Sequence, residues 1–151
     1  VAYLSHKTQK NQVKANIASI RAKWLEDLRE AAAKFIETIS IIINSVHDNK
    51  EWFESKEATD IFSGLIYTQT KISLMLDKRK DENKELIRTT EQIIDALKAL
   101  RINTSDSEVG RLTNSFESQI SAVLEKAWSD IKSDLNPTLL PRVRIKFNGD
   151  V

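Results

Sequence analysis

The sequence predicts an all-α fold, an antiparallel four-helix bundle whose first helix extends past the other three. Apolar residues recur at intervals of three and four over most of the chain, which is the period of one helix face. Only 3 glycines and 2 prolines occur among 151 residues, of which 30% are charged, a composition typical of long helices. A chain of this length without cysteine can bury enough surface to fold with no disulfide or metal.

The first predicted helix is long and uninterrupted. Its apolar stripe consists of Val13, Ile17, Ile20, Trp24, Leu28, Ala31, Phe35, Ile39, Ile42 and Val46. No glycine or proline occurs within residues 1–63, whereas the polar residues 47–50 break the period. Because Trp24 lies on the stripe, we expect it in the core. Ile41 lies off the stripe, so more than one neighbour is needed to cover this end of the helix.

The polar residues 77–84 decide the architecture of the middle of the chain. A break near Lys80 gives helices over 56–77 and 82–100, the first of them with Ser55 as a suitable N-cap. The alternative is one helix from 56 to 100 in a long three-helix coiled coil, because the apolar residues on both sides keep one heptad phase. The wide apolar faces of the first two helices favour the four-helix bundle, since a two-helix seam would leave part of them in water.

The last predicted helix spans 107–135, and Pro137 and Pro141 prevent its continuation. Trp128 lies on the apolar stripe of this helix, and we expect it in the core. The three predicted regions are therefore a stalk over 1–23, a bundle over 24–135 and a tail over 136–151.

Two further segments are candidate contacts for a partner protein. Trp52 and Phe53 lie in the connection after the first helix, where they can either close the end of the bundle or remain exposed. The tail alternates basic and apolar residues, a period of two typical of a strand, and its basic residues are Arg142, Arg144 and Lys146. Such a segment can lie along the bundle or add to a sheet of another protein.

Basic charge is concentrated at the start of the chain. The whole chain has a net charge of only +1. Residues 1–25 nevertheless contain no acidic residue and five basic ones, which are Lys7, Lys10, Lys14, Arg21 and Lys23. Residues 1–4 are aliphatic with one tyrosine and are followed at once by lysines, as at the cytoplasmic end of a transmembrane helix. We therefore expect a preceding membrane anchor, with Lys7, Lys10, Lys14 and Arg21 near anionic lipid.

No catalytic or metal-binding pattern occurs. His6 and His47 are about 40 residues apart, and neither has a carboxylate or histidine at the spacing of a helical metal site. Phosphate-binding glycine motifs and nucleophile elbows are absent. The sequence therefore predicts a protein that is not an enzyme and that uses no cofactor or metal.

Three short segments of the chain resemble segments of a known group of proteins. The run Arg21-Ala22-Lys23-Trp24-Leu25-Glu26-Asp27-Leu28-Arg29 resembles a pattern in uncharacterised bacterial and prophage proteins with one N-terminal transmembrane helix and a helical cytosolic domain. Residues 71–76 and 125–132 are also similar to that group, and the similarity spans about residues 7–135. Where the group often has Asn-Pro, which implies a helix break, this chain has Asp77-Lys78 and so departs from the group's pattern at that point. The resemblance implies an anchor, a helical bundle and a mobile-element or phage-defence setting, but no activity.

These observations lead to two hypotheses of function. The first is a membrane-tethered helical module on the cytoplasmic side of a bacterial inner membrane, which assembles with a protein partner or with itself as a homo-oligomer. The second is a soluble accessory bundle that associates with nucleic acid, because clustered lysines also bind phosphate. No aromatic residue interleaves the lysines to stack on bases, which favours the first hypothesis.

Overall fold

The structure, a computed structural model, describes residues 2–102 and 105–135. Within them lie four α-helices and one turn of 3₁₀ helix: α1 (Ala2–Asp48), η1 (Trp52–Glu54), α2 (Lys56–Met75), α3 (Asp81–Ala99) and α4 (Ser107–Leu135). The predicted all-α four-helix bundle is confirmed. The alternative helix from 56 to 100 is wrong, because α2 ends at Met75 and α3 begins at Asp81. The predicted strand in the tail lies outside the described residues.

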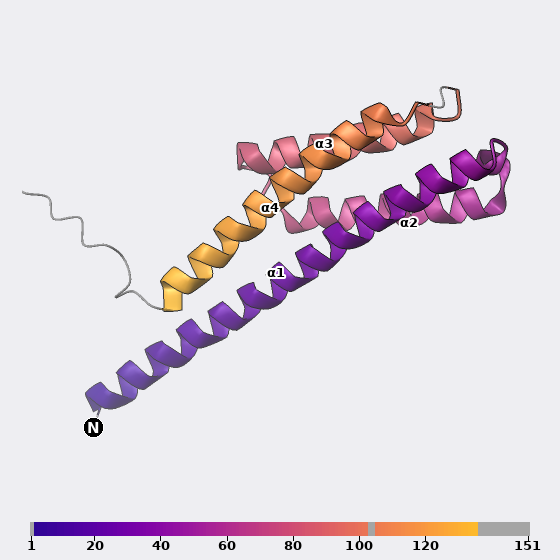
Figure 1. The fold of residues 1–151 in the computed structure, drawn as a ribbon. Coiled ribbons are helices and arrows are strands. Elements are labelled where there is room, and N and C mark those ends of the chain that lie inside the picture. The colour runs from indigo at the N-terminus through magenta and orange to yellow at the C-terminus, as the bar shows by residue number, and fades with distance from the viewer. Residues whose placement is uncertain (1, 103–104, 136–151) are drawn as a thin grey trace, which may run out of the picture.

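Each helix runs antiparallel to the one before it (Figure 1). The long helix α1 packs against both α2 and α4, and α3 packs mainly against α4. Towards its N-terminus α1 continues past the turn between α2 and α3, and α4 accompanies it over part of that length (Figure 1).

From Leu28 onwards the core follows the predicted apolar stripe of α1, whereas Val13, Ile17 and Ile20 are exposed and Trp24, expected in the core, is half-buried. The largest fully buried side chains of the core include Leu28, Phe35, Ile39, Ile42, Leu65, Ile72, Leu86, Ile93, Leu97, Val109 and Phe116. The rings of Phe35 in α1 and Phe116 in α4 pack with centroids 5.2 Å apart. Ile41, which lies off the stripe, is not covered by the other helices of the chain and is 38% exposed.

The connection between α1 and α2 closes one end of the bundle. Trp52 is buried and packs against Phe53 and Phe62, with ring centroids 5.5 and 6.3 Å away. Ser55 then caps α2, because its Oγ accepts a hydrogen bond of 3.0 Å from the backbone N–H of Ala58. The sequence left open whether Trp52 closes the end of the bundle or is exposed to a partner. In the structure Trp52 closes the end of the bundle.

At the other end, α4 reaches further along α1 than the sequence suggested. Ala18 and Leu25 of α1 form a small buried cluster with Ile131 of α4, and Arg21 forms an ion pair with Asp134. The packed region thus includes Ala18, inside the range 1–23 assigned to the stalk.

The expected burial of Trp128 is wrong, since 48% of this residue is exposed. Successive helical residues are about 100° apart. Because Ile131 points at α1 and Ala127 packs beside it, Trp128 turns to the outside, where the Lys132 ammonium lies 5.9 Å from the ring centroid.

Candidate functional site

A groove of about 590 Å³ lies between α1, the α2–α3 turn and α4. Its apolar lining includes Trp24, Met75, Leu76, Val123 and Ala127. Four carboxylates and two lysines also line it: Asp77, Glu82, Glu85, Asp130, Lys80 and Lys126. We call it the Trp24 groove; it combines an apolar surface with a charged, predominantly acidic border.

Trp24 joins α1 to the end of α2. Its indole N–H donates a hydrogen bond of 3.1 Å to the backbone carbonyl of Met75, the last residue of α2. The last carbonyls of a helix have no partner within the helix, so this bond satisfies one of them. Trp24 is half-buried, and its remaining surface lines the groove.

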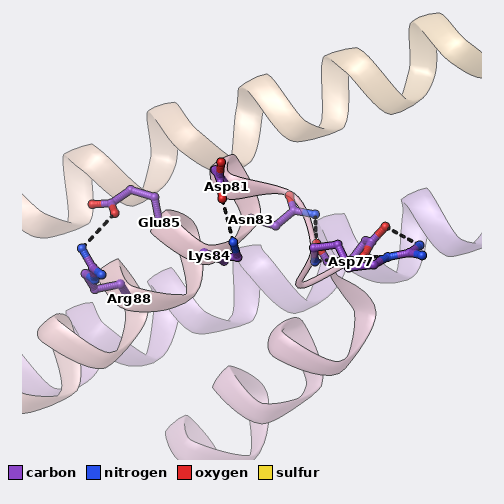
Figure 2. A network of polar contacts seen from close by, with 7 residues as sticks. Asp77, Asp81, Asn83, Lys84, Glu85 and Arg88 are labelled. Atoms are coloured by element: carbon purple, nitrogen blue, oxygen red, sulfur yellow. Dashed lines mark hydrogen bonds and ion pairs between the residues drawn. The ribbon is translucent and has the colours of Figure 1, made fainter.

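The turn between α2 and α3 is organised by Asp77 (Figure 2). The Asp77 carboxylate accepts hydrogen bonds from the backbone N–H, Nε and Nη2 of Arg79, at 3.1, 2.9 and 2.9 Å. The backbone carbonyl of Asp77 accepts a bond of 3.0 Å from the side chain of Asn83, which is buried. The hydrogen bonds from Arg79 lower the pKa of Asp77 from its ordinary 3.8 to about 2. These bonds stop α2 and start α3 beside the groove.

One ion pair connects α3 to α4 at the border of the groove. The Lys126 ammonium lies 2.9 Å from the Glu82 carboxylate. The hydrogen bond from Lys126 lowers the pKa of Glu82, and the same bond raises the pKa of Lys126. Both side chains are largely exposed, so the pair contributes little to stability but sets the local charge pattern.

The N-terminal segment of α1, residues 2–17, precedes Ala18, which is buried beside Ile131 of α4, and residues 9 and 11–17 of this segment are exposed. Val13, Ile17 and Ile20 are 57%, 44% and 70% exposed. Because they are spaced by four and three residues, they form one apolar row on the helix surface. Lys14 is exposed next to this row.

The predicted site residues fall in different places. Lys7 and Lys10 belong to the same helical segment as Lys14, whereas Arg21 is engaged with Asp134 in the packed region. Phe53 is half-buried beside Trp52 at the opposite end of the bundle. Arg142, Arg144 and Lys146 lie outside the described residues.

Sequence reasoning did not predict the Trp24 groove. Its lining comes from one residue of α1, the α2–α3 turn with the first residues of α3, and the part of α4 between Gln119 and Asp130. These three parts are more than 30 positions apart in the chain. The polar run 77–84 predicted the turn, but no sequence pattern predicted that Trp24 and Val123 would both lie beside it.

Two classes of site are absent from residues 2–102 and 105–135. No three His, Cys, Asp or Glu side chains in this part converge as a metal site would require. None of its helices combines the length and apolar character needed to cross a bilayer. Comparison of the chain with protein-family models, with curated proteins and with solved structures gives no match.

Proposed function

We propose that this protein is a helical interaction module held at the cytoplasmic face of a bacterial inner membrane through the N-terminal segment of α1. The observation that carries the proposal is the exposed apolar row Val13, Ile17 and Ile20 in a stretch of α1 that has five basic residues and no acidic one. A basic helix with one apolar face binds anionic lipid surfaces, because burial of the apolar side chains adds to the attraction between lysines and phosphates.

The length of α1 suits this role. The 16 residues of the N-terminal segment extend about 24 Å beyond Ala18, at about 1.5 Å per residue. This length is enough for the lysines and the apolar row to meet a membrane surface at the end of the bundle. The mobile-element or phage-defence setting enters the proposal only through the resemblance of residues 21–29 and the two further segments.

The assembly part of the proposal is supported by the outer face of α2. Tyr67 and Leu74 are seven residues apart, so they share one face, and they are 72% and 77% exposed. Ile66 is also exposed next to Tyr67. Large apolar side chains grouped on one helix are typical of an interface with a protein partner or, most simply, with a second copy in a twofold dimer.

Sedimentation with lipid vesicles tests the membrane part. The chain should bind vesicles that contain phosphatidylglycerol more strongly than phosphatidylcholine vesicles, and added salt should weaken the binding. Replacing Lys7, Lys10 and Lys14 by Gln should reduce binding roughly 100-fold, since each lysine contributes about 1 kcal/mol at an anionic surface.

The matched control replaces Lys50, Lys56 and Lys98 by Gln. Lys50 lies between α1 and α2, Lys56 begins α2 and Lys98 lies in the last turn of α3, so all three are far from the N-terminal segment. They are exposed, and their loss changes the net charge by the same amount. The control should bind as the unaltered chain does. Equal loss in both triple variants would mean that only net charge matters and would contradict a role for the N-terminal segment.

A further inference from the structure

The Trp24 groove contains a buried hydrogen-bonding group that the described residues leave unpaired. Gln119 of α4 lines the groove, and its Oε1 atom is buried without a hydrogen bond, while its Nε2 donates to Ser115 Oγ at 3.4 Å. A buried acceptor without a donor is destabilising, so an occupant that supplies a donor would be favoured. An occupant that brings backbone N–H and C=O groups would satisfy this amide in either orientation.

The rest of the lining restricts the occupant further. Apolar side chains from three elements make most of the groove surface, so the occupant must present apolar groups on one side. Of the four carboxylates at the border, Asp77, Glu82 and Glu85 are paired with Arg79, Lys126 and Arg88. Asp130 is therefore the border carboxylate that a basic group of the occupant would meet first. An extended peptide that alternates apolar and basic residues fits both conditions, because its side chains alternate between its two faces.

The chain itself contains such a peptide just after α4. Residues 142–147 read Arg-Val-Arg-Ile-Lys-Phe, with apolar and basic residues in strict alternation. Six extended residues span about 20 Å. The groove follows α4 from Gln119 to Asp130, about 17 Å at 1.5 Å per residue.

The connecting residues are long enough. The distance along α4 from its last residue, Leu135, back to Val123 in the groove is about 18 Å. The seven residues 136–142 can span about 23 Å when extended. A smaller hollow lined by Ala127, Asp130, Ile131 and Asp134 leads from the end of α4 towards the Trp24 groove.

We propose that residues 142–147 bind in the Trp24 groove of their own chain. Val143, Ile145 and Phe147 pack on the apolar lining beside Trp24, and a backbone N–H or C=O pairs with the Gln119 amide. The long side chains of Arg142, Arg144 and Lys146 reach the carboxylates of the border. This contact is independent of the membrane role, because it uses neither the apolar row nor the lysines of the N-terminal segment.

Disulfide trapping tests the proposal cleanly, because the chain has no cysteine of its own. The test pair is Ala122→Cys with Ile145→Cys, since Ala122 is exposed and lines the groove. The control pair is Ser121→Cys with Ile145→Cys, since Ser121 is exposed, is outside the groove lining and lies at nearly the same distance along the chain. Under mild oxidation of the full chain, the test pair should close an intramolecular disulfide about tenfold faster or more, a preference of about 1.4 kcal/mol.

A charge variant examines the acidic border in the same assay. Changing Arg142, Arg144 and Lys146 to Glu should remove the preference for the test pair, whereas changing Lys50, Lys56 and Lys98 to Glu should leave it. Equal rates for the two cysteine pairs would overturn the proposal. A disulfide that forms only between chains, at a rate that rises with concentration, would also overturn it and would place the tail of a second copy in the groove.

Discussion

The indole N–H of Trp24 donates to the backbone carbonyl of Met75 across 51 positions of sequence. This bond anchors the end of α2 on α1. It lies at the level where the bundle changes from four packed helices to α1 and α4 alone. On one side of it lie the main core and the Asp77 turn; on the other, α1 is accompanied by α4 as far as Ala18 and then continues as the N-terminal segment. Trp24 thus links the packed bundle, the groove and the segment proposed to meet the membrane.

Substitution of Trp24 should separate its hydrogen bond from its packing. Trp24→Phe keeps an aromatic ring but loses the bond to Met75, and should lower the free energy of unfolding by about 1 kcal/mol. Trp24→Ala also removes the packed ring and should cost about 3 kcal/mol. Urea denaturation followed by circular dichroism measures both. No loss in Trp24→Phe would mean that the bond contributes nothing, and equal losses in the two variants would mean that the packed ring contributes nothing beyond the bond.

The other two tryptophans should differ strongly from each other. Trp52 is buried against Phe53 and Phe62, so Trp52→Ala should lower the free energy of unfolding by about 3–5 kcal/mol. Trp128 is half exposed, and Trp128→Ala should cost less than about 1 kcal/mol. The same denaturation experiment decides this, and a larger loss for Trp128 would contradict the described packing of α4 on α1.

The Asp77 turn should have a signature at acid pH. Because the folded-state pKa of Asp77 is lowered to about 2, its ionised form stabilises the folded state fully above pH 3.8, and this contribution is lost as the pH falls towards 2. The stability difference between the unaltered chain and Asp77→Asn should therefore shrink from pH 4 to pH 2. Carboxyl NMR titration gives the pKa directly, and a value near 3.8 would mean that Arg79 does not hold the carboxylate in solution.

Self-association should depend on the outer face of α2. At micromolar concentration, light scattering should give a mass of about twice the 17.2 kDa of one chain, as in a twofold dimer. Tyr67→Gln with Leu74→Gln should return the mass to that of one chain with little change in stability, because both side chains are largely exposed. A monomer in the unaltered chain would rule out a tight dimer in solution.

The sequence was sufficient where one local pattern decides the structure. The polar run 77–84 and the wide apolar faces predicted the break between α2 and α3, and the stripe predicted which side of α1 is buried. Trp128 was misplaced because neighbouring positions of one helix differ by about 100°, and only the direction in which α4 meets α1 decides which of them is covered. The start of the packed region was also misplaced, because it depends on how far α4 reaches, which the contacts of Ile131 and Asp134 determine.

The central claim is that the basic N-terminal segment of α1 meets an anionic membrane rather than nucleic acid. The most direct measurement is a competition, at physiological salt, between phosphatidylglycerol-containing vesicles and duplex DNA supplied at equal phosphate concentration. The account predicts that the chain sediments with the vesicles and that Val13→Ser, Ile17→Ser and Ile20→Ser together weaken this binding, because lipid accepts the apolar row and a duplex does not. Preferential binding to the duplex, unaffected by those three substitutions, would contradict it.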